Sequence, residues 1–182
     1  AVSYASGYGS KTSSGQISVQ TSDAGTSGVS GQLSFTSGTT SAGSSGSITL
    51  GSGKSVSGKG GAIALSVGEG NTRSGGDVYI SGGEISMYTG GSLSFASGYG
   101  SSLSSGSIVV RSMNSGTEGV SGAFEFMSGT SSSGASGLIS IVTGEATGGK
   151  GGDILLSVGT TVTTDGGLVN MKAGNSVPLT GG

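Results

Sequence analysis

Large apolar residues alternate with small or polar residues in short segments that recur along the whole chain. Each segment follows a glycine and places apolar side chains at its third and fifth positions, as in GAIALS from Gly61. Residues two apart lie on one side of an extended strand, whereas an amphipathic helix needs spacings of three and four. Most of these apolar residues are β-branched or aromatic, which are types that favour strands. The pattern therefore predicts one short strand per segment.

The segments recur with a 15-residue spacing that has two exceptions. The starting glycines are Gly15, Gly31, Gly46, Gly61, Gly76, Gly91, Gly106, Gly122, Gly137, Gly152 and Gly167, and a segment without a glycine opens the chain at Ala1. The steps from Gly15 to Gly31 and from Gly106 to Gly122 are each longer by one residue. Such short, regular repeats are typical of solenoids. We predict an all-β fold: a β-solenoid with about 15 residues per rung, twelve rungs and a narrow, flattened cross-section.

The third and fifth positions of each segment are the candidate core of this solenoid. We expect the rungs to stack about 4.8 Å apart, so that equivalent side chains form ladders. The predicted core residues are Ile17, Val19, Leu33, Phe35, Ile48, Leu50, Ile63, Leu65, Val78, Ile80, Leu93, Phe95, Ile108, Val110, Phe124, Phe126, Ile139, Ile141, Ile154, Leu156, Val169 and Met171.

A longer repeat divides the chain into two halves. When each residue is compared with the residue 91 positions later, 45 of the 91 pairs are identical. We predict two continuous blocks of six rungs, residues 1–91 and 92–182. The extra residue of each 16-residue unit falls near Asp23 or Asn114, which are types tolerated in a left-handed backbone at a turn or bulge.

The opposite side of the strands differs between the halves. In the first half it is largely Ser, Thr, Gln and Ala, whereas in the second it carries apolar residues, a pattern that suggests a contact surface. The predicted lateral contacts are Val109, Met127, Leu138, Val142, Leu155 and Leu168. The alternative is that these residues cover a partly formed second layer of the same chain.

Composition narrows the function. The chain has 42 Gly among 182 residues and charged residues make up only 9%, which by composition alone suggests a flexible linker; the fixed glycine positions argue against that. Cys and His are absent, which excludes disulfides, thiolate or imidazole metal sites and Ser-His or Cys-His dyads. We therefore predict no enzyme activity, no cofactor and no metal site. The net charge of −2 favours no nucleic-acid partner, and no apolar run is long enough to span a membrane.

The G-x-[IVL]-x-[LVF]-x-[ST]-G unit with its Ser/Gly-rich return resembles the β-solenoid repeat arrays of secreted and cell-surface fibrous proteins. The resemblance implies an extracellular or cell-surface structural role. Because neither end has a distinct terminal unit, we expect a longer array or end-to-end stacking of copies. The predicted function is a subunit or segment of an extracellular filament. Its partner is another copy of the chain, bound by end-to-end β-stacking and by the lateral contacts.

Two alternative functions fit a repeat of this length. Ice-binding β-solenoids display regular Thr-x-Thr ranks on one flat face. The corresponding outward positions here read Ser18, Ser34, Thr49, Ala64, Tyr79, Val109 and Glu125, so bulky and charged residues break the rank. The other alternative is a surface adhesin, for which the sequence shows no specific binding residue.

Overall fold

The computed structural model describes residues 1–11, 13–71, 74–162 and 164–174. These residues contain no helix and no β-strand; the chain is extended and changes direction at short bends. Bends or turns lie at 10–11, 26–27, 41–43, 56–58, 71, 86–88, 101–103, 117–119, 132–134, 147–149, 162 and 164. They therefore follow the spacing of the starting glycines, and each lies in the Ser/Gly-rich return between two apolar segments.

The chain divides into two units, Ala1–Leu93 and Ser94–Gly182. The division falls two residues beyond the boundary between the halves of the sequence repeat, 1–91 and 92–182. Within each unit, apolar segments alternate with bent returns. The division of the backbone thus follows the longer repeat of the sequence.

The predicted β-solenoid is wrong for the described residues. A solenoid needs strands that exchange backbone hydrogen bonds at a spacing of about 4.8 Å. Here the backbone hydrogen bonds join residues of the same return: Gly15 N to Gly7 O, Gly28 N to Gly25 O, Gly91 N to Gly83 O and Gly106 N to Gly98 O. Within the described part, the apolar segments form no ladder, and the predicted rungs and flattened cross-section are absent.

The reason lies in the path of the returns. Each starting glycine of a 15-residue repeat comes close to the residue nine positions before it, so the return folds back on itself as a narrow turn. A Cβ placed on Gly61 would lie 3.3 Å from the Cβ of Ser52, and one on Gly137 would lie 3.4 Å from that of Ser128. A return that closes in this way does not carry the chain round to lie on the preceding segment, as a 15-residue coil requires.

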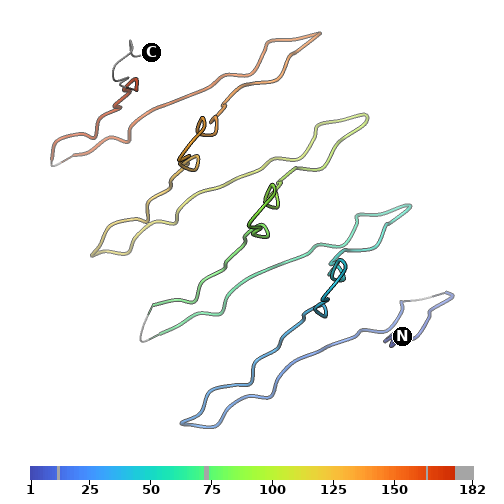
Figure 1. Ribbon diagram of the computed structural model, residues 1–182. Coiled ribbons are helices and arrows are strands. Elements are labelled where there is room, and N and C mark those ends of the chain that lie inside the picture. Colours follow the sequence, from blue (N-terminus) through green and yellow to red (C-terminus); the bar gives the residue numbers. More distant parts are fainter. Residues whose placement is uncertain (12, 72–73, 163, 175–182) are drawn as a thin grey trace. The chain divides into compact units, whose positions relative to one another are not determined.

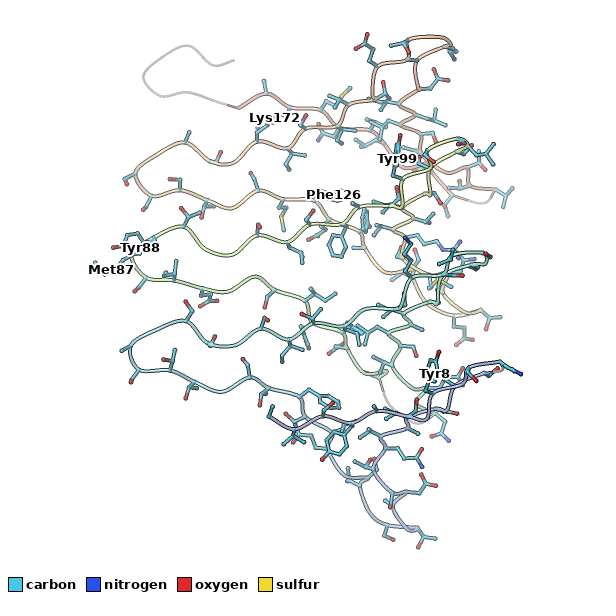
Figure 2. All side chains as sticks on the ribbon, turned by 90° about the vertical axis from the view of Figure 1, so that its right-hand side faces the viewer. Tyr8, Met87, Tyr88, Tyr99, Phe126 and Lys172 are labelled. Atoms are coloured by element: carbon cyan, nitrogen blue, oxygen red, sulfur yellow. The ribbon has the colours of Figure 1, made fainter. Side chains whose placement is uncertain are left out.

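Successive turns point in different directions, and the direction recurs after three repeats rather than one. In the first unit, the turns at 41–43 and 86–88 lie three repeats apart and point to the same side in both views (Figures 1 and 2); Met87 and Tyr88 mark the second of them. Figure 1 places the turns at 26–27 and 56–58 on opposite sides of that unit. The prediction that one 15-residue repeat makes one coil is therefore wrong: in the first unit a turn points to the same side again after three repeats.

The predicted core residues, from Ile17 to Met171, are not buried in the described chain, which contains no buried residue at all. The predicted alternation of sides is visible at the third positions. From the second segment onward, third-position side chains are 46% (Val169) to 62% (Ile48) exposed. The six outward residues of the second half are 75% (Val109) to 87% (Leu138) exposed. Fifth-position side chains, at 56% (Ile80) to 85% (Met171), overlap with the outward range, so no core is closed.

Close approach requires glycine at only some positions, such as Gly82, Gly91 and Gly100, where a Cβ would lie under 3.0 Å from backbone atoms. Among the described residues, Gly119 at φ 138° is the only residue with a positive φ. Asp23 and Asn114 do not adopt the left-handed conformation predicted for the 16-residue units. In these units the starting glycine instead approaches the residue ten positions back: Thr21 for Gly31 and Ser112 for Gly122. The extra residue therefore lies inside the return.

Candidate self-association surface

The third and fifth positions of the apolar segments make up what we call the inner positions. They project to one side of each segment because the backbone there is extended and side chains alternate. Phe124 and Phe126 show this directly: their rings meet edge to face, with centroids 4.6 Å apart and an interplanar angle of 88°. Phe126 is marked in Figure 2. Contacts within one segment leave much of each ring uncovered.

In the first unit, inner positions of three successive segments face a common hollow. Tyr4 and Ala5 of the first segment, Ile17, Ser18 and Val19 of the second and Phe35 of the third line a space of about 510 Å³. The lining is mostly apolar, yet Ile17 and Phe35 remain 55% and 69% exposed because the space is open. An unfilled apolar hollow lacks the close contacts that stabilise a protein interior. It is therefore a surface suited to receive further apolar side chains.

Hydroxyl side chains brace several of the turns. The residue six positions before a starting glycine is Ser or Thr in four described repeats, and each of these hydroxyls bonds within its turn. Ser55 Oγ accepts from Gly58 N at 3.0 Å, and Ser131 Oγ accepts from Gly134 N at the same distance. Thr40 Oγ1 accepts from Ala42 N at 3.4 Å, whereas Thr161 donates to the carbonyl of Thr164. These bonds are of the local side chain-to-backbone kind that favours turns over regular structure.

The bases of the turns require glycine at some positions. A Cβ on Gly82 would lie 2.5 Å from Gly91 O, and one on Gly91 would lie 2.8 Å from Gly83 N. Both distances are shorter than real Cβ contacts allow, so the backbone would have to move. The close approach accompanies the 2.9 Å hydrogen bond from Gly91 N to Gly83 O. The narrow turn thus depends on the absence of side chains at its base.

Charged groups are sparse and exposed. Lys150 Nζ lies 2.8 Å from Asp153 Oδ2, and both side chains are more than three-quarters exposed, so the pair contributes little stability. The Tyr79 hydroxyl donates to Asp77 Oδ2 at 2.9 Å. Within the described ranges there is no group of three or more Asp or Glu that could hold a metal ion.

The predicted lateral-contact residues lie on the outer side and in the second unit. Val109, Met127, Leu138, Val142, Leu155 and Leu168 are all strongly exposed. Met113 adds a further exposed apolar side chain beside Arg111, where Arg111, Ser112, Met113 and Asn114 line a hollow of about 280 Å³. This hollow lies at the 16-residue repeat of the second unit.

The turn geometry has a sequence signal of its own, separate from the strand pattern. In the 15-residue repeats, a glycine lies eight positions before most starting glycines, usually after Ser or Thr, as in Ser37-Gly38, Ser52-Gly53 and Ser128-Gly129. The structure shows that this dipeptide lies opposite the starting glycine, at the point where the two arms of the turn come together. Paired glycines eight apart are therefore the signal that indicates narrow turns in this sequence.

Comparisons with protein-family models, with curated proteins and with solved structures find no match to this chain. Among the described residues there is no helix both long and apolar enough to cross a membrane.

Proposed function

We propose that this chain is a structural protein that assembles with copies of itself into an extracellular or cell-surface filament. The observation that carries the proposal is the exposure of the inner positions in every described repeat. End-to-end β-stacking is not part of the proposal, since the described residues contain no strand that it could extend.

The amount of exposed surface supports an assembled state. The chain exposes 18310 Å². A compact folded monomer of 17.1 kDa exposes roughly 8,000 Å². The excess is about 10,000 Å², which is larger than the roughly 2,000–5,000 Å² that obligate interfaces bury. Because large apolar residues are exposed along the whole described chain, covering part of this surface by association is favourable.

The repeat identifies another copy as the best-fitting partner. A partner that covers the inner positions along the whole chain must present apolar side chains at the same 15-residue spacing. A second copy has this spacing because it has the same sequence. The low content of charged residues adds little repulsion to such an encounter. The extracellular location rests on the resemblance to Ser/Gly-rich arrays of secreted and cell-surface fibrous proteins.

Sedimentation velocity and negative-stain electron microscopy over a concentration series test the proposal. We expect the sedimenting mass to rise with concentration, elongated particles to appear, and sulfate to lower the threshold because it strengthens apolar burial. A species that stays monomeric at every concentration, with and without sulfate, would contradict self-assembly. Immunogold labelling of intact source cells tests the location, and label confined to the cytoplasm would refute it.

A further inference from the structure

We propose that the two 16-residue repeats fix the register of assembly, so that the first half of one copy lies beside the second half of the next. This half-staggered register rests on the proposed self-assembly and specifies its geometry. It concerns parallel copies displaced by 91 positions, the length of the longer repeat.

A strictly 15-residue repeat leaves the register open, because a partner shifted by one repeat presents the same pattern. The two longer steps, Gly15 to Gly31 and Gly106 to Gly122, remove this freedom. A shift by one 15-residue repeat misplaces the repeats that begin at Gly31 and Gly122 by one position. In an extended chain, a slip of one residue exchanges the inner for the outer side.

The number of misplaced repeats is larger for a shift of three repeats, and it falls to zero for a shift of 91 positions. A shift of three 15-residue repeats misplaces every pair of repeats separated by a longer step, as from Gly15 to Gly61, which are 46 apart. A shift of 91 positions matches every starting glycine and places one longer return beside the other. The structure gives these returns a distinct shape, since Gly31 and Gly122 approach residues ten positions back, Thr21 and Ser112. Displacements of 0 and 91 positions are therefore the ones that align every repeat of one copy with a repeat of the other.

Charge favours the displacement of 91 over zero displacement. In a parallel pair without displacement, every charged residue lies opposite its own copy, so all opposed charges are alike. With a displacement of 91, Lys54 lies opposite Glu145, and only Lys59 and Lys150 are like charges facing each other. Lys150 is already paired with Asp153 within its own chain.

Disulfide trapping distinguishes the registers, because the chain has no cysteine of its own. Ile48 and Ile139 are equivalent inner positions 91 apart, and Leu93 is the equivalent inner position three repeats after Ile48. Chains carrying Ile48→Cys are mixed with chains carrying Ile139→Cys, assembled and oxidised. A bridge forms only where the two Cα atoms come within about 7 Å.

We expect the mixed dimer, bridged between position 48 of one chain and position 139 of the other, to exceed both homodimers by about fivefold. This is the upper range for the effect of one exposed ion pair, here Lys54 with Glu145. The control mixture of Ile48→Cys with Leu93→Cys gives little mixed dimer. Predominant homodimers, or equal amounts of all three species, would overturn the half-staggered register.

Pelleting of the same samples is measured separately, so that the two proposals fail in different ways. Material that does not pellet refutes self-assembly itself. Pelleted material with the wrong cross-links refutes only the register.

Deletion of both Asp23 and Asn114 tests the role of the longer repeats. All steps then have the same length, so the control mixture is expected to give more mixed dimer than it does in the unaltered chain, while the protein still pellets. The pairing of Lys54 with Glu145 keeps a preference of its own for positions 48 and 139. A control yield that the deletion leaves unchanged would show that the longer repeats do not set the register.

A second probe concerns the charges. Lys54→Glu is expected to lower the mixed-dimer yield about two- to fivefold, and Glu145→Lys in the same chain to restore it. A yield that responds to neither substitution would overturn the pairing of Lys54 with Glu145 and with it the choice of 91 over zero displacement.

Discussion

The two halves of the chain share their inner positions and differ on the outer side. Residues 91 apart are both large and apolar at every inner position, as for Ile63 and Ile154. On the outer side, Ser47 and Ala64 of the first half correspond to Leu138 and Leu155 of the second. The inner surface is thus a property of the repeat, whereas the outer apolar residues belong to one half. If the chain assembles as proposed, this difference predicts two separate contacts, an inner one that builds the filament and an outer one that joins filaments.

The largest effect is expected from the inner positions, and it should be the same in both halves. The double substitution Ile63→Ser/Leu65→Ser removes two apolar side chains, each contributing about 1.5–3 kcal/mol when covered. The threshold concentration for assembly should rise at least about a hundredfold. Ile154→Ser/Leu156→Ser should give an equal rise by sedimentation.

The matched control lies in the same segment. Ala62→Ser/Ala64→Ser changes the two outward residues between Gly61 and Leu65 and should leave the threshold within about twofold. If the inner and outer pairs have equal effects, or if only one half responds to the inner substitutions, the shared inner surface is not the contact that builds the filament.

An intermediate effect, confined to the second half, is expected from the outer residues. Leu138→Ser/Leu155→Ser should narrow filament bundles in electron micrographs and raise the concentration at which bundles form by about tenfold, while the threshold for single filaments stays constant. The reciprocal change, Ser47→Leu/Ala64→Leu, gives the first half the same outer residues and should widen the bundles. Bundles of unchanged width in both variants would remove the distinction between the two halves.

The smallest effect is expected at a turn base that the two halves build differently. The first half has Gly82-Gly83, and the second has Ala173-Gly174 at the equivalent positions. In Gly82→Ala the new Cβ meets Gly91 O, so the hydrogen bond from Gly91 N to Gly83 O should weaken, at a cost of about 1 kcal/mol.

Amide hydrogen exchange at Gly91 reports this change, and about fivefold faster exchange is expected. Gly83→Ala is the control, because a Cβ on Gly83 meets nothing within 4 Å. Equal exchange rates in the two variants would mean that the close approach at Gly82 does not hold the turn.

The sequence predicted the local features of this chain and not its long-range ones. The period of two is reflected in the lower exposure of third positions, such as Ile139 at 49% beside Leu138 at 87%, but none of the predicted core residues is buried. The 15-residue spacing correctly located the returns. Both features depend only on neighbouring residues.

The prediction that failed was the path of the Ser/Gly-rich returns, which were expected to wrap the chain into a coil. A Ser/Gly-rich return long enough to wrap into a coil is also long enough to close on itself, and hydrophobic periodicity does not distinguish the two paths. Ser55 and Ser131 form hydrogen bonds within their turns, but the sequence pattern does not distinguish them from the many other serines of the chain. Among the described glycines only Gly119 has a positive φ, whereas a Cβ on Gly82 or Gly91 would collide with the backbone at the base of a turn. The candidate surface was therefore predicted as a set of residues, but its exposure was not.

Thiol labelling of the assembled protein compares the two sides of one segment. Ile63→Cys places a single thiol on the inner side, and Ala64→Cys places one on the outer side, in a chain that has no other cysteine. In dilute, unassembled protein both thiols should react with maleimide at similar rates, because both positions are exposed. In pelleted filaments, we expect the thiol at position 63 to react at least about tenfold more slowly, since covering a group by a stable contact lowers its access in proportion to the stability of that contact. The thiol at position 64 should remain reactive. Equal rates at the two positions in the pelleted protein would contradict assembly through the inner surface.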